Sequence, residues 1–204
     1  MIGAIISMVI KMKTIMFDFD GTLTKKNNNI WERMWQIIGA SDVDYKLYKK
    51  YKNKEINYIE WVEEIEKEYI KRNFNKAMLL ECCKDIEIIN GLEETLIALK
   101  KEGYKLYIVS GGVDVAIRNT LGCLTKYFDG ISSCKFRFDD NGNLIDIIPT
   151  KYDEEGKRIF IEEYCTKKNT KPEDITFVGN GDNDEWVYLS GCKTICLNPV
   201  YHHY

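Results

Sequence analysis

Two aspartates separated by one residue carry the clearest chemical signal in the sequence: Asp18 and Asp20, within the run DFDGTLT at residues 18–24. Residues two apart on an extended chain point the same way. Their carboxylates therefore repel each other unless a bound cation or a shared proton offsets the charge. A polar turn that caps a strand would explain Asp-X-Asp alone, but the longer run is more specific. We therefore expect a functional site at Asp18 and Asp20.

A hydroxyl, two glycines and a lysine further along the chain suit an anion. Ser110 is followed by Gly111 and Gly112, and glycines let a backbone approach a ligand closely. Amides at the start of a following helix form an anion site. Lys157 is expected in the first turn of a helix, where the helix dipole disfavours a cation. Either chance or a local anion that needs the lysine would explain this placement. Lys151 is the competing candidate for a lysine that binds such an anion.

The run GNGDND at residues 179–184 is acidic and rich in glycine. One acid at the start of a helix is an ordinary cap. Capping alone would not require two acids, Asp182 and Asp184, together with Asn180 and two glycines. Carboxylates, an amide oxygen, a hydroxyl with glycine amides and one lysine would together bind a hard, oxygen-liganded cation and a phosphate.

The segments that must position these residues alternate between strands and helices. An alternating order predicts an α/β fold with a three-layer, Rossmann-like parallel sheet, and such sheets bind ligands at the carboxyl ends of their strands. A small β-hairpin is expected around the Asn141-Gly142 turn. The expected strands are 13–17, 104–109, 130–134, 175–178 and 194–197, the hairpin strands 135–138 and 143–148, and the helices 92–101, 113–121, 157–168 and the segment that ends at Leu189.

A helical insertion is expected between the first strand and residue 89. After the polar break at 25–29, apolar residues recur at helical spacing in 30–38, 58–69 and 77–80. The insertion leaves the sheet just after Asp20, so it would lie over the strand ends as a lid. We divide the chain into a core of residues 12–26 and 88–204 and a helical cap of residues 27–87.

Composition excludes several classes of protein. With 29 basic and 32 acidic residues and a net charge of −3, the chain shows no footprint for nucleic acid or an anionic membrane. Seven cysteines without a Cys-X-X-Cys pair argue against zinc and a disulfide framework and favour a reducing cytoplasm. The apolar residues 1–10 are too few to span a bilayer, and we interpret them as a mis-called start or an apolar arm. Nothing in the sequence indicates an oligomeric state.

In their order and spacing these motifs resemble the haloacid dehalogenase superfamily of phosphatases. The similarity is greatest to its phosphoserine-phosphatase-like branch, in which a helical, C1-type cap is inserted between the first two motifs. The resemblance extends from about Lys13 to Pro199. DFDGTLT is highly specific for the family, whereas the Ser-Gly-Gly, Gly-Lys and GNGDND motifs are weaker individually and count together.

The resemblance implies a role for each candidate residue. Asp18 would be the nucleophile that accepts the phosphoryl group, and Asp20 would protonate the leaving oxygen and then activate water. Ser110, the Gly111 amide and Lys157 would hold the phosphate. The implied ligands of Mg²⁺ are Asp18, the Asp20 carbonyl, Asn180 and Asp184.

Two departures from the family pattern affect these expectations. Asn180 stands where the family has aspartate, which removes one negative charge from the metal site. Asn27 and the acids Glu63 and Glu64 stand where phosphoserine enzymes carry a glutamate and a carboxylate-binding arginine. We therefore expect a small phosphorylated metabolite other than strictly phosphoserine. A phosphotransferase on the same site and a non-catalytic phospho-ligand binder are the alternatives.

Overall fold

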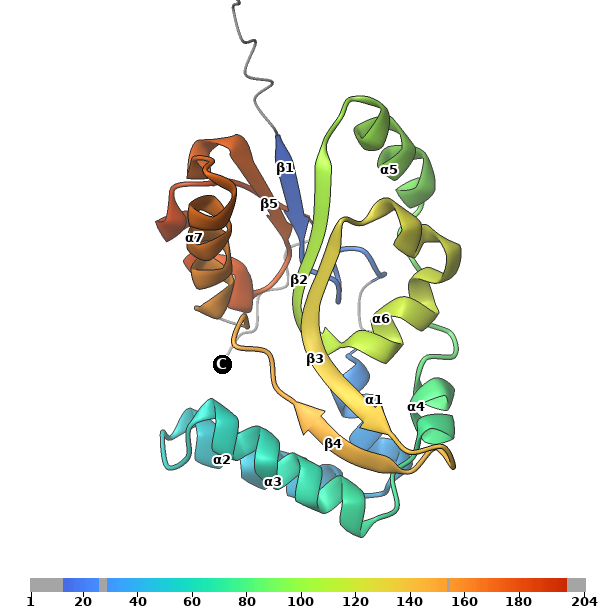
Figure 1. Ribbon diagram of the computed structural model, residues 1–204. Helices are drawn as coiled ribbons and strands as arrows, with labels where there is room; N and C mark the ends of the chain where they lie inside the picture. Colours follow the sequence, from blue (N-terminus) through green and yellow to red (C-terminus); the bar gives the residue numbers. More distant parts are fainter. Residues whose placement is uncertain (1–12, 26–28, 154, 198–204) are drawn as a thin grey trace, which may run out of the picture.

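A six-stranded sheet in the order β4-β3-β2-β1-β5-β6 forms the centre of the protein (Figure 1). The structure is a computed structural model that describes residues 13–25, 29–153 and 155–197, so the predictions for residues 1–10 and Asn27 lie outside the described residues. All strand pairs are parallel except β3 with β4. The predicted α/β class is confirmed. The strands are β1 Thr14–Phe17, β2 Lys105–Val113, β3 Gly130–Phe138, β4 Leu144–Ile148, β5 Ile175–Gly179 and β6 Lys193–Cys196.

Helices cover both faces of this sheet, because its central strands are apolar on both sides. Leu106 and Ile108 of β2 pack in the cluster that includes helices α5 and α6. Met16 and Val109 point the other way and pack against α7, as expected for strand residues of alternating direction. Figure 1 shows α5 and α6 on one side of the sheet and α7 on the other. These helices span Leu92–Lys101, Asp114–Leu121 and Gly156–Lys168.

Two strands are longer than the sequence predicts. β2 does not end at Val109 but continues through the Ser-Gly-Gly motif to Val113, and its register against β3 shifts between Val109 and Val113. β3 is one strand instead of the predicted pair 130–134 and 135–138. Its first part pairs with β2 and its second part with β4. The hairpin therefore extends the main sheet, because one long strand can serve two neighbours. The segment Asp182–Ser190 is a 3-10 helix.

The predicted helical insertion consists of four helices that lie at the carboxyl ends of the strands and against the hairpin (Figure 1). Asn57 starts α3 with a reciprocal capping box to Glu60. Helix α2 lies in a stretch for which the sequence predicted no helix. No helix in the described ranges is long and apolar enough to cross a membrane. The helices are α1 Ile30–Ile37, α2 Ser41–Lys52, α3 Tyr58–Lys71 and α4 Lys76–Cys82.

Backbone hydrogen bonds close the neck of this insertion. The Lys25 amide donates to the Glu87 carbonyl at 2.8 Å, and the Ile89 amide donates to the Leu23 carbonyl at 3.0 Å. Beyond the neck, Trp35 and other apolar cap residues share one buried cluster with the hairpin. The cap is thus joined to the core at both of its ends and packs against the hairpin. Its assignment as a separate domain stays a prediction.

Candidate active site

Lys157 is the centre of a buried group of charges. It lies in the first turn of α7 with no exposed surface, and its Nζ is 3.3 Å from Asp18 Oδ1 and 2.6 Å from Asp184 Oδ1. Burial alone would lower the pKa of Lys157, but Asp18, Asp184 and Asp153 outweigh it and raise that pKa above its usual value. The lysine is therefore a permanent cation. Lys151, the competing candidate, is exposed and pairs with Glu163 at 2.7 Å.

Asp18 and Asp20 differ in their affinity for protons. Asp18 follows β1, and its amide is fixed by the Val178 carbonyl of β5 at 2.9 Å. Burial raises the pKa of Asp18 to about 6, against the lowering effect of Lys157. Burial, and then the charge of Asp18, raises the pKa of Asp20 to about 8. Near pH 7 Asp20 therefore holds a proton while Asp18 is mostly ionised, and this allows the two groups to coexist.

The Ser-Gly-Gly motif lies beside both aspartates. The buried Ser110 Oγ accepts a hydrogen bond from the Gly112 amide at 3.1 Å, and a hydrogen bond from this serine lowers the pKa of Asp18. A Cβ on Gly112 would stand 3.0 Å from Asp20 Oδ2. The strand can approach the Asp20 carboxylate this closely because the residue there has no side chain.

Asp153 lies among the site residues, although the sequence analysis did not identify it. Its Oδ2 is 2.2 Å from the position that a Cβ on Gly111 would take. Its Oδ1 accepts a hydrogen bond from Asn183 Nδ2 at 3.3 Å. On the same glycine, the Gly111 carbonyl accepts a hydrogen bond from the Trp31 indole of the cap at 3.1 Å. Asp153 lies in the acidic loop before α7, and its nearness to Lys157 in the chain was the available signal.

The loop after β5 packs against the DFDGTLT run. Asn180 Oδ1 accepts a hydrogen bond from the Thr22 hydroxyl at 3.0 Å. A Cβ on Gly21, whose φ is +74°, would lie 2.4 Å from Asn180 Nδ2. Asp184 Oδ2 accepts from the amides of Asn180 at 2.9 Å and Gly181 at 3.2 Å. The structure thus places Asn180 against Gly21 and Thr22, and it places Asp184 on Lys157, the lysine that also pairs with Asp18. Thr22 is a partner that the sequence reasoning missed.

Oxygen atoms dominate the place where the predicted metal would bind. Hard divalent cations take carboxylate, carbonyl and amide oxygens. Asp18 and Asp20 supply such atoms, and Asp20 Oδ1 is buried without a hydrogen-bond partner. Asn180 Oδ1 keeps a second lone pair beside its bond to Thr22. Among the described residues no three His, Cys, Asp or Glu side chains form a metal-binding group, and the predicted ligand set also includes an amide and a main-chain oxygen. The donor chemistry fits Mg²⁺.

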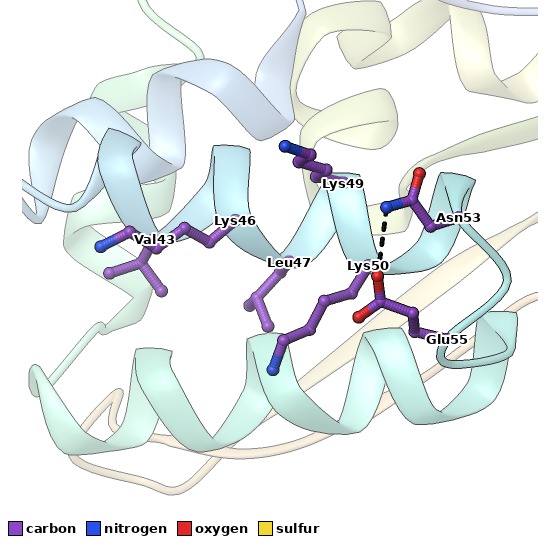
Figure 2. A pocket seen from close by; sticks show the side chains of 7 residues that line it. All are labelled: Val43, Lys46, Leu47, Lys49, Lys50, Asn53 and Glu55. Carbon is purple, nitrogen blue, oxygen red and sulfur yellow. Dashed lines mark hydrogen bonds between the residues drawn. The ribbon is translucent and has the colours of Figure 1, made fainter.

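An open pocket in the cap is separate from this group of residues. Figure 2 shows its lining along α2, where Leu47 lies among lysines and Asn53 Nδ2 donates to Glu55 Oε1 at 3.1 Å. None of the predicted site residues contributes to it. The lining residues are Val43, Lys46, Leu47, Lys49, Lys50, Asn53 and Glu55.

Comparison with known proteins agrees with this arrangement. The family model for haloacid dehalogenase-like hydrolases matches residues 12–186. The chain belongs to this family. Among the family's curated members, phosphoserine phosphatase from Methanocaldococcus jannaschii is 26% identical over 197 residues, which cover 93% of this chain and 88% of that protein. Phosphoserine phosphatase from Archaeoglobus fulgidus is 27% identical over 190 residues, and there the chain spans about half of the longer protein, 52%.

A solved structure of this hydrolase family supports the same conclusion. It is described as a phospho-aspartyl intermediate analogue of phosphoserine phosphatase, with a TM-score of 0.66 and 26% identity over 91% of this chain and 86% of that one. The predicted superfamily, its phosphoserine-phosphatase-like branch and the phosphatase class of enzyme are thereby confirmed. These similarities favour an enzyme over the alternative of a non-catalytic phospho-ligand binder.

Proposed function

We propose that this hydrolase is a Mg²⁺-dependent phosphatase that cleaves a small phosphomonoester through an aspartyl-phosphate on Asp18. The observation that carries the proposal is the pairing of an ionised Asp18, held by the buried Lys157, with a neighbouring Asp20 whose pKa is about 8. This pairing provides a nucleophile and a proton donor at neutral pH.

In the first step, the Asp18 carboxylate attacks phosphorus while the bond from phosphorus to the leaving oxygen breaks. Asp20 gives its proton to that oxygen, so the product is a neutral alcohol. Lys157, the Ser110 hydroxyl and the Gly111 amide bind the phosphoryl oxygens during the transfer. These groups stabilise the transferring charge and position the phosphorus for in-line attack.

In the second step, Asp20 is ionised and can accept a proton from water. The water oxygen bonds to phosphorus, the bond to Asp18 breaks, and inorganic phosphate leaves. Asp20 is then protonated again. Monoester hydrolysis without an enzyme is so slow that about 20 kcal/mol or more of barrier must be removed, and several groups acting together can supply that amount.

The proposed cation would neutralise charge on the phosphoryl oxygens. Asp18, the Asp20 carbonyl and Asn180 would hold it. Asp184 was predicted as a further ligand, but its contacts with Lys157 and with two backbone amides support a positioning role more directly. In that role it fixes the lysine against Asp18.

We further propose that the substrate is a small phosphorylated metabolite and that phosphoserine is not the exclusive one. The curated relatives are named for phosphoserine. In this chain, the acids Glu63 and Glu64 of α3 stand where phosphoserine enzymes are expected to carry a carboxylate-binding arginine. Glu64 there pairs with Lys67 at 2.7 Å, so its charge is partly offset.

All seven cysteines are free thiols, which supports a reducing, cytoplasmic location.

The test is a panel of phosphomonoesters with Mg²⁺, including phosphoserine, sugar phosphates, nucleotides and a chromogenic ester. We expect release of inorganic phosphate from at least one ester and its loss in Asp18→Asn. Asp140→Asn, an acid in the exposed hairpin turn, is the matched control and should stay active. Activity that survives Asp18→Asn would contradict the assignment of the nucleophile, and transfer to an added alcohol would identify a phosphotransferase.

A further inference from the structure

The edge of the sheet at β6 exposes apolar surface on the face that α5 and α6 cover elsewhere. Residues that pair across parallel strands point to the same face, and Val178 of β5 pairs with Ile195 of β6. Val178 packs in the buried cluster of α5 and α6, whereas Ile195 is 51% exposed. The burial on this face therefore weakens from the centre of the sheet to its edge.

The opposite face of β6 is covered. The segment Asp182–Ser190 contacts β6, and its Val187 packs in the cluster of α7, so this segment lies on the α7 side. On the side of α5, Ile15, Thr176 and Leu197 are only partly buried. We call these three residues and Ile195 the edge face. A parallel sheet is normally buried on both faces, so this surface calls for a cover.

An apolar segment of the chain adjoins the edge face. Residues 1–10 read MIGAIISMVI, and β1 begins two residues after Met12. Strands β1, β5 and β6 are parallel, so they start at the same edge of the sheet. β6 lies two strand spacings from β1, about 10 Å, and twelve extended residues span up to about 40 Å. Residues 1–12 are therefore long enough to turn back and cover the edge face.

The spacing within this segment suits a helix that lies on an apolar surface. A strand would place Ile5 and Val9 on the same side as Gly3, Ser7 and Lys11, whereas a helix separates the two groups. Nine helical residues span about 14 Å, close to the roughly 13 Å of a four-residue strand such as β1 or β6. The apolar positions with the i, i+3, i+4, i+7, i+8 spacing of one helix face are Ile2, Ile5, Ile6, Val9 and Ile10.

We propose that residues 2–10 dock on the edge face as an amphipathic helix, with the isoleucine side turned toward Ile195 and Leu197. Removal of both apolar surfaces from water favours this contact. The inference goes beyond the proposed phosphatase function and does not depend on it, because Asp18 follows the other end of β1.

Two competing occupants fit the edge face less well. Residues 198–204 follow Leu197 directly, but they read NPVYHHY, with Val200 as the one branched aliphatic residue. A second copy of the chain would cover the edge face but would leave the apolar residues 1–10 without a partner surface.

The test is hydroxyl-radical labelling of two isoleucines, located by tandem mass spectrometry. Ile145 in the hairpin is 53% exposed and serves as the internal reference for Ile195 at 51%. In the full chain we expect Ile195 to be labelled about fivefold more slowly than Ile145, because contact with a helix removes most of its remaining surface from water. In a chain that begins at Met12 the two rates should be equal.

Two single substitutions keep the test valid if the shortened chain does not fold. Ile6→Asp places a charge on the docking side and should equalise the two labelling rates, as the truncation does. Ser7→Asp places the same charge on the other side of the helix and should keep the slow labelling of Ile195. Circular dichroism checks that each variant retains the fold.

Four results would overturn the inference. Equal labelling of Ile195 and Ile145 in the full chain would show that nothing covers the edge face. Equal effects of Ile6→Asp and Ser7→Asp would exclude a helix with one docking side. Slow labelling that survives the truncation but is lost on removal of residues 198–204 would assign the cover to that segment. Slow labelling that weakens on dilution, with a dimer seen by sedimentation, would assign it to a second copy.

Discussion

Asp20 should destabilise the folded protein when no metal is bound, and replacing it with asparagine should stabilise the fold. Its carboxyl group has one buried oxygen without a hydrogen-bond partner, and it lies beside the ionised Asp18. Asparagine has nearly the same shape but carries no charge. Asp20→Asn therefore removes the free-energy cost of keeping this carboxyl group protonated and keeps the packing.

The magnitude follows from the shift of the pKa from 3.8 to about 8. At pH 7 the unfolded chain has lost this proton while the folded chain keeps it, and about three pKa units at about 1.4 kcal/mol each set an upper bound of about 4 kcal/mol. One carboxylate oxygen of Asp20 is buried but the residue as a whole is partly exposed, so water can solvate the charge and we expect about half of that bound. For a protein of this length, ~2 kcal/mol corresponds to roughly 5 °C in Tm.

The sign of the pH dependence is fixed by the same shift. Because the folded-state pKa is raised, the wild type loses stability as pH rises from about 4 to about 8, and the loss is complete above the folded pKa. Thermal unfolding of wild type and Asp20→Asn in a chelating buffer should therefore show a Tm difference that grows across this window and is constant above it. Asp140→Asn is the control and should follow the wild type. A Tm difference near zero, or one independent of pH, would refute the raised pKa.

Two further substitutions test the proposed metal ligand Asn180 and the buried cation Lys157. Asn180→Asp restores a negative charge where the Thr22 hydroxyl can still donate, so the Mg²⁺ concentration for half-activation should fall roughly tenfold; an unchanged titration would exclude Asn180 as a ligand. Lys157→Met leaves the carboxylates of Asp18 and Asp184 without their buried partner, which should cost about 3–5 kcal/mol in urea unfolding and abolish turnover. A stable, active variant would contradict the role of the lysine.

The sequence predicted the layout of the core because its signals are local. An apolar strand before DFDGTLT, glycines after the next strand and the Asn141-Gly142 turn each follow from a few adjacent residues. Lys157 was also recognised from its position alone, in a helical turn where a cation is otherwise unfavourable. These residues meet in space because parallel strands place their carboxyl ends on one edge.

The features that the sequence did not predict depend on tertiary contacts. Helix α2 has a polar surface and buries only Leu47 fully, so its periodicity was weak. The continuation of β2 through the glycines, and of β3 into the hairpin, depends on neighbours that are distant in the chain. Asp153 was missed because an acid in an acidic loop carries no pattern. Only the fold shows that it lies against Gly111.

The most direct test of the central claim is to find the residue that carries the phosphoryl group during turnover. Wild-type enzyme, mixed with a substrate and Mg²⁺ and quenched in acid, would be digested and its peptides analysed by mass spectrometry. We predict one phosphoryl group on Asp18, and none in Asp18→Asn. A phosphoryl group on another side chain, such as Ser110, or turnover without any covalent phosphoenzyme under trapping conditions, would contradict the mechanism.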